Sequence, residues 1–294
     1  MDSKDFQLLV ALHQNARQSY RSLGRRVSLT APAVRERLER LKDQGVLHGY
    51  GLRIEPGIFD RDQLIVIFQG DRTRQEVEKV LELPDVAFVA WRLDGGLGIG
   101  TWSDNIKRTV ENLTRALGSR HSRAAFTERR RDLRPLSILD LQIIDALIDD
   151  PTIPLNNIIE LTGLSPKTVR KRLNALFESS IISILPRIGP TTGSGEIVSY
   201  LAVDGKIEMK ELHRLMGDIV LVNKVEKPPM RYLLCRESDL GSLTAKTSAL
   251  GKLPGVNSVT TTLNREFLFS TKTAHRLVRE QIQKMERSRP GIAA

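Results

Sequence analysis

The chain of 294 residues contains an internal repeat with an offset of 135 residues. The segment Asp5–Leu12 matches Asp140–Leu147, and the same offset places Val34–Leu41 on Val169–Leu176. An ungapped offset kept over so long a span indicates a tandem duplication, because chance similarity does not hold one register. Each copy is long enough to bury a hydrophobic core of its own, so the repeat predicts two similar structural units.

Each copy opens with three helical patterns, and the turn between the second and the third is short. In the first copy, Val34, Leu38 and Leu41 recur at helical spacing and form the inner face of the third pattern. Thr30 and Ser165 stand at the N-cap of the third helix in the two copies, where a side-chain oxygen accepts from a free helix N–H. Two helices joined by a tight turn, with basic residues outward on the second, are typical of a helix-turn-helix.

The remainder of each copy alternates β, α, β, β, α, β. In the first copy we expect strands at residues 64–68, 86–92, 97–102 and 124–128, and helices at 74–83 and 105–117. In the second copy we expect strands at 197–203, 220–225, 232–236 and 259–263, helices at 209–216 and 240–250, and a final helix at 273–286. This order predicts a ferredoxin-like regulatory domain after each helix-turn-helix.

The predicted fold class is therefore α+β, with two winged-type helix-turn-helix domains, each followed by a ferredoxin-like βαββαβ regulatory domain. The expected helix-turn-helix domains are residues 1–55 and 135–189. The expected regulatory domains are residues 60–131 and 195–270, and residues 272–294 form a C-terminal helix and tail.

Three stretches of the first copy, Leu12–Ser19, Val34–Leu41 and Gln44–Tyr50, closely resemble the leucine-responsive regulatory protein/AsnC family. The resemblance implies a DNA-binding helix-turn-helix, a hinge and a ligand-sensing (RAM) domain, and it covers nearly the whole chain. Members of the family typically carry one such unit and dimerise, so the tandem fusion departs from the pattern. The resemblance also implies a homodimer formed through the regulatory domains.

The formal net charge of +10 favours a polyanionic partner, and with the helix-turn-helix pattern it predicts double-stranded DNA. Arg17, Arg21, Arg25 and Arg26 are expected near phosphates. Residues on the outward face of the third helix are expected at base edges, where Arg pairs with guanine and Asn with adenine. The predicted DNA-binding residues are Arg21, Thr30, Pro32, Ala33, Arg35, Glu36 and Arg40 in the first copy, and Ser165, Lys167, Thr168, Arg170, Lys171 and Asn174 in the second.

A glycine-rich loop between two expected strands is the candidate effector site, with Asp94, Gly95, Gly96 and Gly98 as its residues. The family's ligand loop has a glycine and an aspartate here, whereas Gly98 stands where the aspartate would align. The favoured interpretation of this loop is a hairpin in which glycines permit close approach of the backbone. A small-molecule effector is thus an open alternative for the first copy, and the second copy lacks the motif.

An enzyme is the alternative to a regulator, because siroheme decarboxylases resemble the same family. His48, Tyr50 and Arg53 lie in the neighbourhood where such enzymes gather residues around a tetrapyrrole, but the expected aromatic-rich continuation is missing. The five histidines and the single cysteine, Cys235, show no spacing typical of a metal site. We expect a cytoplasmic regulator that is not an enzyme, with no cofactor, no metal and no membrane segment.

Overall fold

The computed structural model describes residues 1–118, 121–189 and 197–287. The first copy contains α1 (Ser3–Gln14), α2 (Tyr20–Val27), α3 (Ala31–Asp43), β1 (Leu47–Ile54), the short 3₁₀ helix η1 (Pro56–Phe59), β2 (Asp62–Phe68), α4 (Arg74–Leu81), β3 (Val86–Arg92), β4 (Leu97–Ser103), α5 (Ile106–Leu117) and β5 (Arg123–Thr127).

The second copy repeats this order. It contains α6 (Ile138–Leu147), α7 (Leu155–Thr162), α8 (Pro166–Glu178), β6 (Ile182–Ile188), β7 (Ile197–Gly205), α9 (Met209–Met216), β8 (Ile219–Glu226), β9 (Pro229–Glu237), α10 (Leu240–Gly251) and β10 (Val256–Thr262), followed by β11 (Asn264–Phe269) and α11 (Thr271–Arg287). The bounds of α7, α8 and α9 equal those of α2, α3 and α4 shifted by the repeat offset. The predicted α+β fold class is confirmed, while the expected tail beyond residue 287 and the expected domain start at residue 195 lie outside the described residues.

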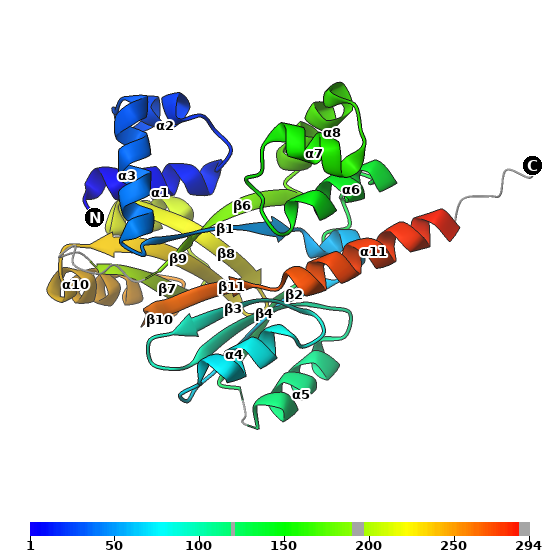
Figure 1. The fold of residues 1–294 in the computed structure, drawn as a ribbon. Coiled ribbons are helices and arrows are strands. Elements are labelled where there is room, and N and C mark those ends of the chain that lie inside the picture. The colour runs from blue at the N-terminus through cyan, green and yellow to red at the C-terminus, as the bar shows by residue number, and fades with distance from the viewer. Residues whose placement is uncertain (119–120, 190–196, 288–294) are drawn as a thin grey trace, which may run out of the picture.

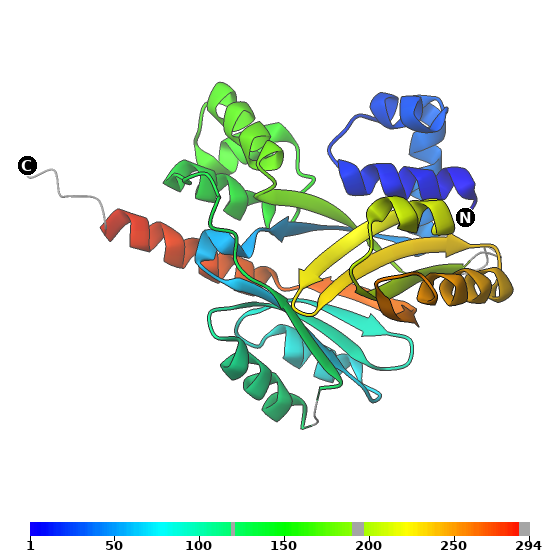
Figure 2. The same cartoon turned by 180° about the vertical axis from the view of Figure 1, so that it is seen from behind.

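Two helical heads stand on the same side of a two-stranded ladder (Figures 1 and 2). Head 1 is α1–α3 and head 2 is α6–α8; each packs its own apolar faces together, with Leu38 and Leu173 buried at equivalent positions. The ladder is formed by β1 and β6, which pair antiparallel. Adding the repeat offset to Tyr50 and subtracting it from its partner Pro186 gives the neighbouring pair, Leu185 and Gly51. The ladder is therefore symmetric under exchange of the two copies.

The regulatory units form two sheets, and the sheet that contains β2–β5 lies below the ladder in the view of Figure 1. The first sheet has the order β11-β3-β4-β2-β5, and the second has the order β10-β7-β9-β8. Helices α4 and α5 cover the outer face of the first sheet, and α9 and α10 cover that of the second. Between the two inner faces, Ile65 and Ala125 pack against Val225 and Met230.

The first sheet takes its edge strand from the far end of the chain. Strand β11 follows the second copy directly and pairs antiparallel with β3, with Phe267 opposite Ala90. This strand was not predicted, and neither was the pairing of β1 with β6. The C-terminal helix α11, expected over residues 273–286, runs from Thr271 to Arg287 and packs against α6 of head 2 (Figure 2). Over the described ranges, no helix combines the length and apolar character that a membrane span requires.

Candidate nucleic-acid interface

The third helix of head 1 is fixed by its cap and its apolar face. The Thr30 hydroxyl accepts a hydrogen bond from the Ala33 backbone N–H at 3.4 Å, and Pro32 occupies the first turn, where no donated N–H is needed. Val34 and Leu41 are fully buried against the rest of the head. The opposite face of α3 is consequently turned to solvent, with Pro32, Arg35, Glu36 and Glu39 exposed.

The exposed face of α3 carries charges of both signs. The Nε of Arg35 lies 2.8 Å from Glu39 one turn further on, and both side chains are mostly exposed. Glu36 stands beside this pair with its own negative charge. Arg35, one of the two arginines of α3 that were predicted to contact DNA, therefore already shares its charge with a carboxylate.

The corresponding helix of head 2 is basic. The Ser165 hydroxyl caps α8 by accepting from the Thr168 N–H at 3.2 Å, and it also lies 2.9 Å from the Thr168 hydroxyl. Both hydroxyls thus serve the helix itself. Further along the outward face are the exposed side chains of Lys167, Arg170, Lys171 and Asn174. In the described part of the chain, none of these four has an ion-pair or hydrogen-bond partner.

Each head holds a buried aspartate at the same repeat position. Asp5 is 1% exposed and pairs with Arg37 at 2.8 Å and with Arg40 at 3.0 Å. Arg40 was predicted to contact DNA, but its guanidinium is tied to the first helix of the head. The prediction for Arg40 missed this because Asp5 lies 35 residues away in the sequence.

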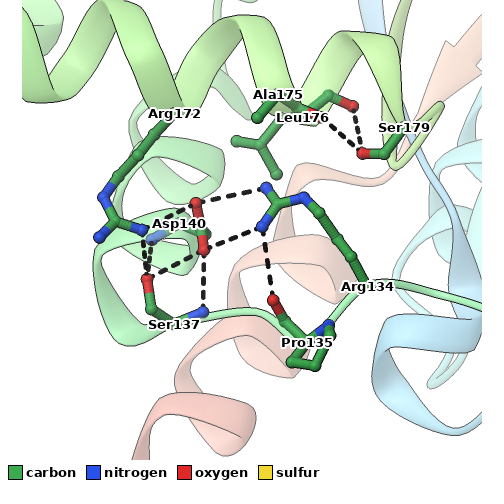
Figure 3. Close-up of polar contacts among 8 residues, drawn as sticks. All are labelled: Arg134, Pro135, Ser137, Asp140, Arg172, Ala175, Leu176 and Ser179. Carbon is green, nitrogen blue, oxygen red and sulfur yellow. Dashed lines mark hydrogen bonds and ion pairs between the residues drawn. The ribbon is translucent and has the colours of Figure 1, made fainter.

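Asp140 takes the place of Asp5 in head 2, and Figure 3 shows its partners. It pairs with Arg172 at 3.2 Å, while the position equivalent to Arg40 is Ala175. A second guanidinium comes instead from Arg134 in the linker, 3.4 Å away. Burial alone would raise the pKa of Asp140, but the Ser137 N–H and the Arg134 guanidinium outweigh it and hold the pKa below its usual value.

Arg17 joins the two heads. Its two terminal nitrogens donate to the carbonyl oxygens of Pro151 at 2.8 Å and Ile153 at 2.9 Å, which belong to the α6–α7 connection of head 2. The Arg17 guanidinium, which was expected near phosphates, thus makes a contact between the two heads. Together with the β1–β6 ladder, this contact fixes the spacing of the two heads.

The second helix of each head differs in charge. On α2, Arg21 and Arg25 are exposed and have no partner among the described residues, and Arg26 donates to Gln14 at 2.7 Å. The equivalent helix α7 contains no basic residue. Head 1 thus offers cations on its second helix, and head 2 offers them on its third.

The candidate effector loop is a tight turn between β3 and β4. Asp94 pairs with Arg92 and accepts from the Gly96 N–H at 3.0 Å. Gly95 has φ +81°, and a Cβ there would lie 2.4 Å from the Asp71 carboxylate. These glycines let the turn lie against the neighbouring loop, and the Asp94 carboxylate already has a partner. The described residues also contain no cluster of His, Cys, Asp and Glu that could hold a metal ion.

This geometry defines a class of protein with two helix-turn-helix units on one chain. The AsnC-type helix-turn-helix domain model matches residues 1–42, and a winged helix-turn-helix DNA-binding model matches residues 136–183. An uncharacterized HTH-type transcriptional regulator of Pyrococcus abyssi is 30% identical over 142 residues, covering 48% of this chain and 84% of the relative. The chain belongs to the Lrp/AsnC family of transcriptional regulators.

Other relatives are matched over shorter stretches. LrpB of Bacillus subtilis is 33% identical over 55 residues, which cover 19% of this chain and 37% of LrpB. Among solved structures, the siroheme decarboxylase NirDL covers 96% of this chain and 99% of its own, with a TM-score of 0.48 and 13% identity. The structure of Bacillus subtilis LrpC covers 47% of this chain and 99% of its own, with a TM-score of 0.31 and 15% identity. TM-scores this low support no argument about activity.

Proposed function

We propose that this chain is a sequence-specific DNA-binding transcription regulator that acts in the cytoplasm and is not an enzyme. The observation that carries the proposal is the pair of exposed third helices on one support. On α8, Lys167, Arg170 and Lys171 have no ion-pair or hydrogen-bond partner among the described residues. Unpaired cations on an exposed recognition helix suit phosphates and guanine edges in a major groove. The regulators among its relatives support the same proposal.

The two heads read unlike half-sites. The repeat aligns the outward residues of α3 with those of α8. It aligns Pro32, Ala33 and Glu36 with Lys167, Thr168 and Lys171, and only the pair Arg35 and Arg170 is identical. Glu36 can accept from a cytosine amino group, whereas Lys171 donates to guanine or phosphate. One chain therefore binds an asymmetric site, with its halves about one helical turn apart.

Binding to the promoter region of its own gene, measured against salt concentration, tests this function. We expect a negative slope of log affinity with log salt and one site that outcompetes bulk DNA by at least about 1000-fold. A flat salt response, or equal affinity for random DNA, would contradict the proposal. Tetrapyrrole absorbance on the purified protein would instead favour the siroheme decarboxylase alternative.

A homodimer through the regulatory domains stays part of the proposal. The inner faces of the two sheets already pack together within one chain. A second polypeptide chain would therefore bind to the helical surfaces or to the strand edges. A mass of two chains in light scattering is the expected result, and a single-chain mass at all concentrations would exclude the dimer. The loop of Asp94, Gly95, Gly96 and Gly98 remains the effector site that the family pattern suggests.

A further inference from the structure

A cavity of about 330 Å³ lies between the inner faces of the two sheets. Alternate residues of the strands line it, as expected for one face of a sheet, including Ile65 and Ile67 on β2 and Tyr200 and Ala202 on β7. A backbone bridge between Phe126 and Lys227 connects β5 with the end of β8. Residues of β10 and β11, among them Thr262 and Phe267, also line the cavity. The volume suits a small organic molecule. We call this space the intersheet cavity.

One wall of the intersheet cavity is aromatic. Phe88, Phe267 and Phe269 lie together, with ring centroids 5.0 Å apart for the first two and 5.2 Å apart for the last two. A Cβ at Gly100 would lie 2.0 Å from the Phe88 ring, and one at Gly51 would lie 2.3 Å from the Phe269 ring. The missing side chains of these glycines let both rings approach the neighbouring backbone closely. A flat apolar ligand would stack on this wall.

The charged groups that line the intersheet cavity are all arginines, and no Asp or Glu belongs to the lining. Arg92 pairs with Asp94, and Arg123 pairs with Asp204. Arg53 differs from both, because its only hydrogen bond within the described residues is a long one, 3.5 Å, to the Val222 carbonyl oxygen. Its side chain is partly exposed, and partial desolvation lowers the pKa of Arg53.

A guanidinium has five N–H donors, and most of those of Arg53 have no protein partner among the described residues, so they are available to an anionic ligand in the cavity. We propose that the intersheet cavity binds an aromatic carboxylate, with the carboxylate on Arg53 and the rings against Phe88, Phe267 and Phe269. A free amino acid fits the site poorly, since its ammonium would meet arginines and find no carboxylate. The ligand class therefore differs from the amino acids that a ligand loop of the family pattern would suggest.

The intersheet cavity is connected to both heads. Arg53 lies on β1, which forms the ladder between the heads, and Ala274 of α11 lines the same space. Helix α11 packs against α6 of head 2. A ligand in the cavity contacts β1 and α11, and these elements position the two heads. Its binding therefore alters the affinity for an operator with two half-sites. This last step rests on the proposed function, whereas the binding of the ligand does not.

Three matched probes test the proposal on the full chain by calorimetry: naphthylpropanoate, its neutral alcohol naphthylpropanol, and the zwitterion naphthylalanine. We expect the propanoate to bind at least about 10-fold more tightly than the other two, the ratio that one charge-assisted hydrogen bond supplies. Arg53→Met should cut its affinity by about 10- to 100-fold, down to that of the alcohol. Arg115→Met, on the exposed face of α5, should change nothing. Ala202→Phe, which fills the space, should abolish binding of all three.

Folding does not confuse this test. Removing a partly desolvated charge that has no ion-pair partner among the described residues leaves stability unchanged or raises it, so Arg53→Met is expected to melt no lower than the wild type. Equal binding of propanoate and alcohol, unchanged binding by Arg53→Met, or tight binding of naphthylalanine would each overturn the proposal. Ligand binding without an effect on operator affinity would overturn the coupling alone. Ligand binding by a chain that binds no specific DNA would leave the cavity standing and contradict the proposed function.

Discussion

The two heads share a core and differ in where their charges lie. In head 1, Arg21 and Arg25 on the second helix have no partner within the described ranges, and Arg35 on the third pairs with Glu39. In head 2 the second helix is uncharged apart from Glu160, and the exposed Lys and Arg side chains of the third have no partner in the part of the chain that the structure describes. Two acidic residues of head 2, Asp145 and Asp149, lie 2.7 and 3.1 Å from the ring nitrogens of His275 on α11. The two heads therefore share the pattern of buried residues and differ in the charged residues at the surface.

The buried aspartates test the shared core, and they should give the largest effect. Asp140→Ala leaves Arg172 and Arg134 without their carboxylate and removes the capping box of α6, so we expect a loss of about 3–5 kcal/mol of unfolding free energy. Urea denaturation followed by circular dichroism measures it. Asp43→Ala, an exposed site at the end of α3, is the control and should stay within about 0.5 kcal/mol. An equally small effect at Asp140 would show that its ion pairs do not stabilise head 2.

His13 separates the stabilities of the heads in acid. Burial, with a smaller contribution from Arg53, lowers its pKa to about 4, and the equivalent residue of head 2 is Ile148. The unfolded chain takes up a proton near pH 6.5 and the folded chain only near 4. Stability is therefore lost as the pH falls through this window, by about 3 kcal/mol.

The variant His13→Ile places the head 2 residue in head 1 and should remove this acid loss. Urea midpoints at several pH values between 7 and 4 are the measurement, with His213→Gln, an exposed site, as the control. Parallel pH dependence in wild type and His13→Ile would contradict the assignment.

The arginines on the third helices sharpen the comparison of DNA binding. Arg170→Ala should weaken binding by about 1–3 kcal/mol, with lost protection confined to the half-site of head 2. Arg35→Ala should act on the other half-site toward the low end of that range, because Glu39 already shares its charge. Footprinting of both variants on one operator distinguishes them. Loss of protection over the same bases, or a short palindrome read by head 1 alone, would refute the two-half model.

Arg17 sets the smallest expected effect. Arg17→Met removes the two hydrogen bonds to the Pro151 and Ile153 carbonyls and leaves the base-facing helices intact. Affinity for the natural operator should fall by about 3- to 10-fold, the worth of one or two hydrogen bonds, while a duplex carrying one half-site should bind unchanged. The wild type should bind an operator lengthened by half a helical turn between its halves more weakly than the natural operator. For the Arg17→Met variant, the ratio of these two affinities should be smaller. Unchanged discrimination would mean that the β1–β6 ladder alone fixes the spacing.

Local patterns predicted most of the secondary structure, because helical and strand periodicities are properties of neighbouring residues. The helix 209–216 and the strand 86–92 have the predicted bounds. Contacts between the copies could not be predicted in this way. Arg17 donates to a carbonyl oxygen in the other copy, and Arg40 pairs with Asp5 on another helix. The sequence shows on which face of a helix such an arginine lies, but it does not show these distant partners.

The intersheet cavity escaped prediction for a related reason. Its lining comes from β1, both sheets and α11, and the role of Arg53 depends on its having no ion-pair partner among the described residues. In the sequence, Arg53 is one of 45 basic residues. The stacked wall of Phe88, Phe267 and Phe269 joins residues that the chain separates by nearly 180 positions.

The first sheet receives its edge strand from the last part of the second copy, and this has a consequence for synthesis on the ribosome. Strand β3 leaves the exit tunnel long before β11, which pairs with it. At roughly 5–20 residues per second, the intervening segment takes on the order of ten seconds to make. During that interval the backbone of β3 has an open edge, to which the β11 of a neighbouring nascent chain on the same message can bind. The order of translation thus makes this fused chain more prone to exchange strands between polypeptides. A chain with a single unit whose strands complete their own sheet would be less prone to it.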